Sequence, residues 1–149
     1  MNAQEFGRTA HVLLIEPENL VRGTVSSVCR DMNLVRILQA TTLAQGEQCL
    51  VARPVQGLML SLAEGDAALD LLERLRAGAF ACNAVIPVAV MASACTKEQV
   101  VRLKALAVQR LLLKPFRIRD VIHTVEQLWP VAEAKVGAAQ LAPGDEAVN

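Results

Sequence analysis

The chain has 149 residues, of which 53% are hydrophobic and 3% aromatic, and its 15 basic and 15 acidic side chains cancel. This length suits one domain whose core consists mainly of Leu, Val and Ala. No apolar run approaches the ~20 residues of a membrane span, and no basic stretch followed by an apolar one opens the sequence. These features argue against a membrane-spanning or secreted protein, and we expect a cytoplasmic one.

The four cysteines lie far apart and form no Cys-x-x-Cys pair, and the chain has only two histidines. This spacing gives no zinc signature and, in a reducing compartment, no disulfide framework. We expect neither a metal ion nor a cofactor, and we interpret the cysteines as small buried hydrophobic residues. They are Cys29, Cys49, Cys82 and Cys95.

Charge is unevenly distributed along the chain. Residues 1–96 carry seven basic and nine acidic side chains, whereas residues 97–119 carry seven basic ones against Glu98 alone, a net charge of +6. Residues 120–149 carry one lysine and five acids. The basic block predicts a local cationic surface. Duplex DNA is a poor partner for it, because the net charge is zero and no helix-turn-helix motif follows.

Five apolar runs alternate with five segments in which apolar residues recur at helical spacing. Strands are predicted over residues 11–15, 34–38, 57–62, 85–91 and 111–113. Helices are predicted over residues 20–32, from Thr41 or Thr42 to 52, from Asp66 to Gly78, from Thr96 to 106, and over residues 121–128. This alternation predicts an α/β domain with a parallel sheet and right-handed crossovers.

The first predicted helix has an N-cap candidate and an apolar face. Asn19 is a good N-cap residue, and the apolar positions of the helix are expected to face inward. Those positions are Leu20, Val21, Val25, Val28 and Met32.

Three regions are expected along the chain. Residues 1–10 form an N-terminal extension, and residues 11–129 form the domain. From Val131 onward the sequence has no periodicity and is rich in small residues, so residues 130–149 are interpreted as a disordered tail.

The run from Gly57 to Leu62 is predicted to be the central strand, because a strand covered on both faces is apolar almost throughout. Its one polar side chain is Ser61. In an open α/β sheet, ligands collect at the carboxyl ends of the strands, so the group at this end matters most for function. Here that group is a neutral hydroxyl.

Several short motifs occur in the order and spacing typical of one family. Ile15-Glu16-Pro17-Glu18 follows the first strand, Ile86-Pro87-Val88 opens the fourth, and Lys114-Pro115-Phe116 follows the fifth. Over residues 11–129 the chain resembles the receiver domain of bacterial response regulators, of the chemotaxis-regulator type. The resemblance implies a flavodoxin-like, doubly wound (βα)5 fold with a five-stranded parallel sheet in the order 2-1-3-4-5.

The resemblance also implies where a phosphorylation site would lie. Receivers transfer a phosphoryl group from a histidine kinase to an aspartate after the third strand, with Mg²⁺ held by two acids after the first. A strand-four hydroxyl and a strand-five lysine bind the phosphoryl oxygens. By position these sites correspond to Ser61, to Glu16 and Pro17, to Ala92 and to Lys114, and the aromatic switch position corresponds to Leu111.

Only Glu16 and Lys114 keep the chemistry that a receiver uses. A serine hydroxyl is unionised at neutral pH and has no neighbouring histidine here to act as its base. Pro17 offers no side-chain oxygen to Mg²⁺, and Ala92 has no hydroxyl. We therefore expect a degenerate receiver that is neither phosphorylated nor an enzyme, with Lys114 partly buried and paired with Glu16. The Lys114–Pro115 bond is expected to be cis, as in the family.

Two functional hypotheses follow from the basic block. The first is phosphorylation-independent binding of a signalling protein, or of a second copy, through the fourth helix, fifth strand and fifth helix; the alternative for this face is a solvated surface without a partner. The second hypothesis is binding of an anion or a cyclic dinucleotide. The candidate residues for both are Lys97, Arg102, Lys104, Arg110, Arg117 and Arg119.

Overall fold

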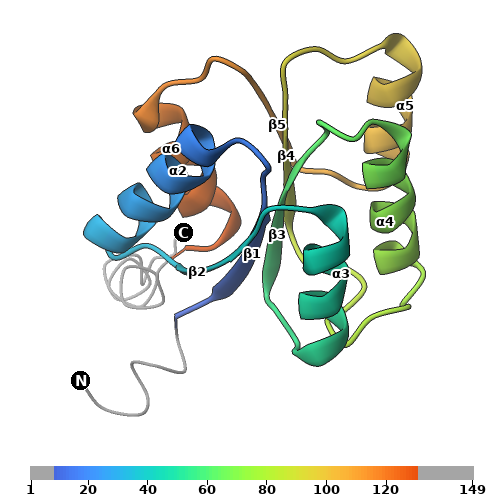
Figure 1. The fold of residues 1–149 in the computed structure, drawn as a ribbon, viewed down its shortest axis with the longest axis horizontal. Coiled ribbons are helices and arrows are strands. Elements are labelled where there is room, and N and C mark those ends of the chain that lie inside the picture. The colour runs from blue at the N-terminus through green and yellow to red at the C-terminus, as the bar shows by residue number, and fades with distance from the viewer. Residues whose placement is uncertain (1–8, 131–149) are drawn as a thin grey trace, which may run out of the picture.

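The computed structural model describes residues 9–130, and the expected extension and tail lie outside them except for Thr9, Ala10 and Pro130. Five strands alternate with five helices (Figure 1). The strands are β1 (His11–Ile15), β2 (Arg36–Ala40), β3 (Gly57–Ser61), β4 (Val88–Ala92) and β5 (Arg110–Leu113). The helices are α2 (Asn19–Asp31), α3 (Leu43–Ala52), α4 (Asp66–Arg76), α5 (Lys97–Ala105) and α6 (Ile118–Leu128).

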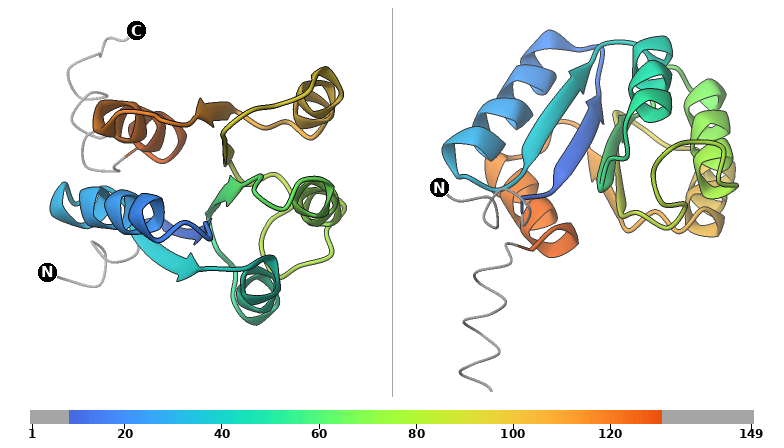
Figure 2. Two further views of the ribbon diagram at one scale, coloured as in Figure 1. Left: turned by 45° about the horizontal axis from the view of Figure 1, so that its top comes forward. Right: turned by 90° about the horizontal axis from the view of Figure 1, so that it is seen from below.

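All strand pairs are parallel, and the strand order is β2-β1-β3-β4-β5, which confirms the predicted flavodoxin-like topology. Helices α2 and α6 cover one face of the sheet, and α3, α4 and α5 cover the other (Figure 2). No helix among the described residues is long and apolar enough to cross a membrane.

The central strand β3 is buried at all five positions, as expected for a strand covered on both faces. Its side chains alternate between two cores: Leu58 and Leu60 pack with α3, α4 and α5, whereas Met59 packs with α2 and α6. These cores consist almost entirely of aliphatic residues, in keeping with the composition.

Two strands begin two or more residues later than predicted. β2 begins at Arg36 rather than at residue 34, because the Leu34 N–H closes a turn by donating to the Cys29 carbonyl. β4 begins at Val88 rather than at residue 85, because Val85 and Ile86 donate to Asn83 within a turn. Both displaced segments contain buried apolar residues, which an apolar pattern alone does not distinguish from strand.

The first helix also differs from its prediction. Glu18, not Asn19, is the N-cap residue, and Asn19 begins α2. Leu20 is 76% exposed and Met32 is 52% exposed, so the inward face is narrower than the spacing suggests. By contrast, the expected caps at Thr42 and Thr96 are present, each hydroxyl accepting a backbone N–H three residues on.

The amino end of β3 is closed by the chain's one tryptophan. Trp129 is buried, and its indole Nε1 donates to the Gln56 carbonyl at 3.0 Å. A Cβ on Gly57 would overlap this indole, so only glycine fits beneath it. The last residues of α6 are thereby fixed against the centre of the sheet.

Arg76 joins the two loops that precede β4 and β5. Its guanidinium donates to the carbonyls of Ala84 and Ile86 before β4 and to those of Leu106 and Ala107 before β5. The fork geometry of arginine allows this multiple contact. Arg76 is therefore a structural residue, although no sequence pattern identified it as one.

The cysteines follow the prediction only in part. Cys29 and Cys82 are buried, whereas Cys49 and Cys95 are half-buried at the edge of one core, and all four are free thiols. Burial raises the pKa of Cys29 to about 11, so its thiol is unreactive at neutral pH.

Candidate functional site

The carboxyl ends of the parallel strands bring most of the predicted site residues to one edge of the sheet. Glu16 directly follows β1, Ser61 ends β3, Ala92 ends β4 and Lys114 directly follows β5. The parallel topology explains why residues nearly a hundred positions apart meet at this edge. The structure brings Glu16 and Lys114 into direct contact.

Lys114 lies between two carboxylates. Its Nζ is 2.9 Å from Oε1 of Glu16 and 3.1 Å from Oε1 of Glu18. Glu16 is fully buried, the Lys114 side chain is 15% exposed, and that of Glu18 is 54% exposed. The Glu18 N–H donates to the other oxygen of Glu16, which fixes both acids relative to each other. The cluster is thus buried at Glu16 and open to solvent at Glu18.

The electrostatics of this cluster favour the charged lysine. Burial alone would lower the pKa of Lys114, but its contacts with Glu16 and Glu18 outweigh that effect and leave the pKa above its usual value. The backbone also holds the residue in place. The Lys114 N–H donates to the Ala92 carbonyl, and the Lys114–Pro115 bond is cis, as expected.

Ser61 has a local structural role. It is 3% exposed, and its Oγ accepts a hydrogen bond from the Ala63 N–H at 3.1 Å, which stabilises the turn after β3. His11 lies at the opposite end of β1, and His123 is exposed on α6. Neither histidine is placed to activate the hydroxyl as a nucleophile.

The remaining predicted site positions are apolar or contribute only backbone. Pro17 is exposed, Ala92 is buried, and Leu111 is half-buried against the core beneath α5. A leucine in that packing cannot make the polar contact that a switch tyrosine makes. Ser93, one residue past Ala92, lines the same hollow as Lys114.

Two residues at this edge were missed by the sequence analysis. Glu18 is the second acid that contacts Lys114, whereas the resemblance placed the acidic pair at Glu16 and Pro17. Arg22 donates to the Glu16 carbonyl at 2.8 Å and to Asn19 Oδ1 at 2.6 Å, so a guanidinium lies against the loop after β1. The signal for Glu18 was present as an acid at spacing i+2; Arg22 had no signal beyond its place in the first helix.

The fold family implies a Mg²⁺ site here, and the residues present do not fit one. The Glu16 carboxylate is engaged by Lys114 and by the Glu18 N–H, and its carbonyl accepts from Arg22. Pro17 and Ser61 supply no anionic oxygen, whereas Mg²⁺ requires near-octahedral oxygen coordination. Among residues 9–130, no group of three or more His, Cys, Asp or Glu side chains is arranged to hold a metal ion.

A partly apolar hollow of about 430 Å³ lies beside the cluster. Glu18 and Lys114 line it, together with Ser93 and the exposed Leu20. Its further lining residues are Val21, Thr24, Pro115 and Phe116.

Two cations of the basic block are paired with acids in the structure. Arg102 is paired with two acids of α4, at 2.6 Å to Asp70 and 3.5 Å to Glu73, and the Asp70 hydrogen bond raises the pKa of Arg102. Lys114 is held in the glutamate cluster. The other five are distributed over α5, β5 and the start of α6: Lys97, Lys104, Arg110, Arg117 and Arg119.

The chain was compared with protein-family models, curated proteins and solved structures. No protein-family model and no curated protein matches the sequence. Among solved structures, a response regulator from Thermotoga maritima has a TM-score of 0.70 at 18% identity, covering 80% of this chain and 97% of that chain. A response regulator receiver protein from Pseudoalteromonas atlantica has a TM-score of 0.68 at 21% identity, covering 79% and 95%.

A chemotaxis protein from Vibrio cholerae has a TM-score of 0.70 at 15% identity, covering 80% of this chain and 98% of that chain. At such identities the similarity shows the fold. The chain has the flavodoxin-like α/β fold, in the five-stranded form found in the receiver domains of two-component signalling.

Proposed function

We propose that this chain is a degenerate receiver that acts in two-component-type signalling by binding proteins, without being phosphorylated and without catalysing a reaction. The supporting observation is that Lys114 is already held by Glu16 and Glu18. An incoming phosphoryl group would have to compete with carboxylates that carry the charge it would supply. The neutral Ser61 hydroxyl, engaged by the Ala63 N–H, is a poor acceptor for that group.

The proposed docking face consists of α5, β5 and α6. Three large apolar side chains are exposed on these elements or directly at their ends: Val101 at 67%, Leu113 at 54% and Ile118 at 54%. The exposed cations Lys104 and Arg119 lie on the same elements. Apolar groups accompanied by positive charge suit a partner surface with an apolar centre and acidic surroundings.

Phosphorylation is tested by incubating the full chain with acetyl phosphate, and separately with beryllofluoride, each with Mg²⁺. Intact mass and backbone amide shifts are then measured on the same samples. We expect no added mass and no shift at Glu16, Ser61 or Lys114, while a phosphorylatable receiver treated in parallel responds. A phosphoryl adduct, or a specific Mg²⁺-dependent shift at these residues, would contradict the proposal.

The docking face is tested by recovery of binding partners with the Val101→Glu/Leu113→Glu variant. A matched control, Val51→Glu/Val85→Glu, changes two exposed valines, at 64% and 76%, on α3 and before β4. We expect the first variant to lose partners, or self-association in sedimentation, that the wild type and the control retain. Equal recovery by all three proteins would exclude this face.

Binding of an anion or cyclic dinucleotide by the basic block is the second candidate function. Its support is the excess of cations on α5, β5 and α6, but Arg102 and Lys114 are already paired with acids. Titration with a cyclic dinucleotide at two salt concentrations tests it. Saturable amide shifts at Arg110, Arg117 and Arg119 that weaken steeply with salt would favour this function over protein docking.

A further inference from the structure

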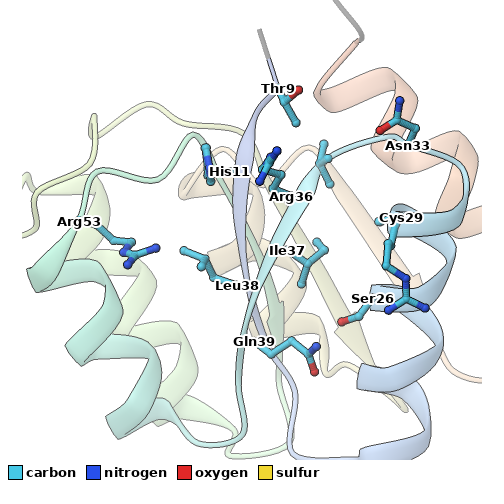
Figure 3. Close-up of a pocket in the computed structure, with 12 residues that line it drawn as sticks. Thr9, His11, Ser26, Cys29, Asn33, Arg36, Ile37, Leu38, Gln39 and Arg53 are labelled. Carbon is cyan, nitrogen blue, oxygen red and sulfur yellow. The ribbon is translucent and has the colours of Figure 1, made fainter. Parts of the chain in front are cut away.

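A hollow of about 530 Å³ lies along β2, the edge strand opposite β5 (Figure 3). It extends over both faces of the strand. Ser26 and Cys29 of α2 line it on one side, and His11 of β1 and Arg53 after α3 line it on the other. β2 itself contributes residues 36–39.

The backbone of β2 is open on its outer side. The Arg36 N–H donates to the Ala10 carbonyl, and the Ala40 carbonyl accepts from the Glu16 N–H. Because successive residues of a strand direct their backbone groups to opposite sides, those of Ile37 and Gln39 point away from β1. Within residues 9–130 no strand pairs with that side. Such an edge is a template for an added strand.

The walls of the hollow are cationic. Arg30 and Arg53 line it, and no Asp or Glu is among its described lining residues. Arg30 is 3.3 Å from Asp31, but both side chains are about 70% exposed, so this ion pair is weak. The hollow therefore favours a ligand that carries negative charge.

Two further features fit a polypeptide better than a small anion. Ile37 and Leu38 are half-buried on opposite faces of β2, and a second hollow of about 460 Å³ continues along the Leu38 side. Side chains of an added strand would alternate between these two faces. The Ser26 hydroxyl is buried at the α2 wall and has no hydrogen-bond partner, so it offers a polar contact inside the hollow.

We propose that the β2 edge binds an extended, carboxylate-bearing segment of a partner protein as a sixth strand of the sheet. The segment's backbone pairs with Ile37 and Gln39, and its carboxylates face Arg53. Because β2 and β5 are opposite edges of the sheet, this surface is separate from the α5, β5 and α6 face. A chain with both surfaces can hold two partners at once, which a simple docking module cannot.

The probe for this proposal is an N-acetylated peptide of six alternating valine and glutamate residues, titrated into the ¹⁵N-labelled full chain. We expect saturable shifts at Ile37 and Gln39 and slower hydrogen exchange of their amides. The Arg53→Glu variant should bind at least fivefold more weakly. The Lys104→Glu variant, which makes the same change of charge on the other face, should bind as the wild type does.

A backbone test complements the charge test. Gln39→Pro removes an outward N–H that pairs with nothing in the sheet, so the fold should tolerate it at this edge. We expect an unchanged far-ultraviolet circular dichroism spectrum and at least fivefold weaker peptide binding. Gln39→Ala, which keeps the N–H, should bind as the wild type does.

Four outcomes would overturn the proposal. They are the absence of saturable shifts, shifts centred on α5 and α6, equal shifts on titration with pyrophosphate alone, and shifts at Ile37 and Gln39 that appear on concentrating the protein without peptide. The third identifies a small-anion site, and the fourth identifies a second copy of this chain as the occupant.

Discussion

The two ends of β3 are stabilised by different physical means. At Gly57 the strand is covered by the Trp129 indole, with no room for even a Cβ between them. The Ser61 end lies at the edge where Lys114 and two glutamates form a cluster that solvent reaches through Glu18. One end therefore depends on shape and the other on charge. The first should respond to changes of volume, the second to changes of charge and pH.

The largest effect is expected from Trp129→Ala at the packed end. Loss of this buried side chain should lower the free energy of unfolding by about 4 kcal/mol, measured by urea denaturation. The loss should be the same at pH 7 and pH 10, because only packing and one neutral hydrogen bond are removed. A loss below about 1 kcal/mol would show that α6 is not fixed by this contact.

At the charged end, Lys114→Met should cost about 3 kcal/mol, because it leaves the Glu16 carboxylate buried without its cation. The matched Glu16→Gln/Lys114→Met variant removes both charges and should recover most of this loss. If the double variant is as unstable as the single one, packing by the lysine side chain rather than charge stabilises this end.

Adding volume at the packed end should have a smaller effect than removing the tryptophan. Gly57→Ala places a Cβ against the indole and should cost about 2 kcal/mol in urea denaturation. In the Trp129→Ala background the same substitution should cost much less, because the clash is gone. If the losses from the two substitutions were additive, Gly57 and Trp129 would not interact energetically.

The pH dependence distinguishes the two ends directly. The pKa of Lys114 in the folded chain is raised above its usual value of 10.5, so its stabilising effect is complete below that pH. It is lost as the pH rises through the folded pKa. The difference in unfolding free energy between wild type and Lys114→Met should therefore shrink above pH 10.5, whereas the Trp129→Ala difference should not follow this titration.

The smallest effect is expected for Ser61→Ala. The hydroxyl accepts one hydrogen bond, and water can satisfy the Ala63 N–H in its place, so the cost should be about 1 kcal/mol or less in the same assay. A much larger loss would mean that Ser61 takes part in the charged cluster.

The sequence predicted the sheet because its signals are local and redundant. Alternating apolar runs, the threonine caps and the motifs at Glu16 and Lys114 all indicate the same topology, which the structure confirms. The errors occur at apolar residues that lie in turns instead of strands, or that have helical spacing but are exposed. Leu34 and Val85 continue an apolar pattern but lie in turns, and Leu20 has helical spacing but faces solvent.

The site was predicted less completely, because its geometry depends on contacts between distant segments. The pairing of Lys114 with Glu16 followed from their positions after β5 and β1, and the structure contains it. The second carboxylate, from Glu18, depends on how the loop after β1 turns. The pairing of Arg102 with α4 depends on how two helices face each other, which no short sequence window encodes. The correspondence of Ser61, Pro17, Ala92 and Leu111 to the phosphorylation and switch positions of a receiver stays a prediction.

Finally, the closure at Trp129 affects how the molecule responds to force. Its indole bonds to Gln56, whose N–H bonds to the carbonyl of His11, so the start of β1 and the end of α6 lie close together. We therefore expect tension applied across residues 9 and 130 to act on neighbouring points of the fold and to load the contact between Trp129 and Gly57 before the parallel sheet.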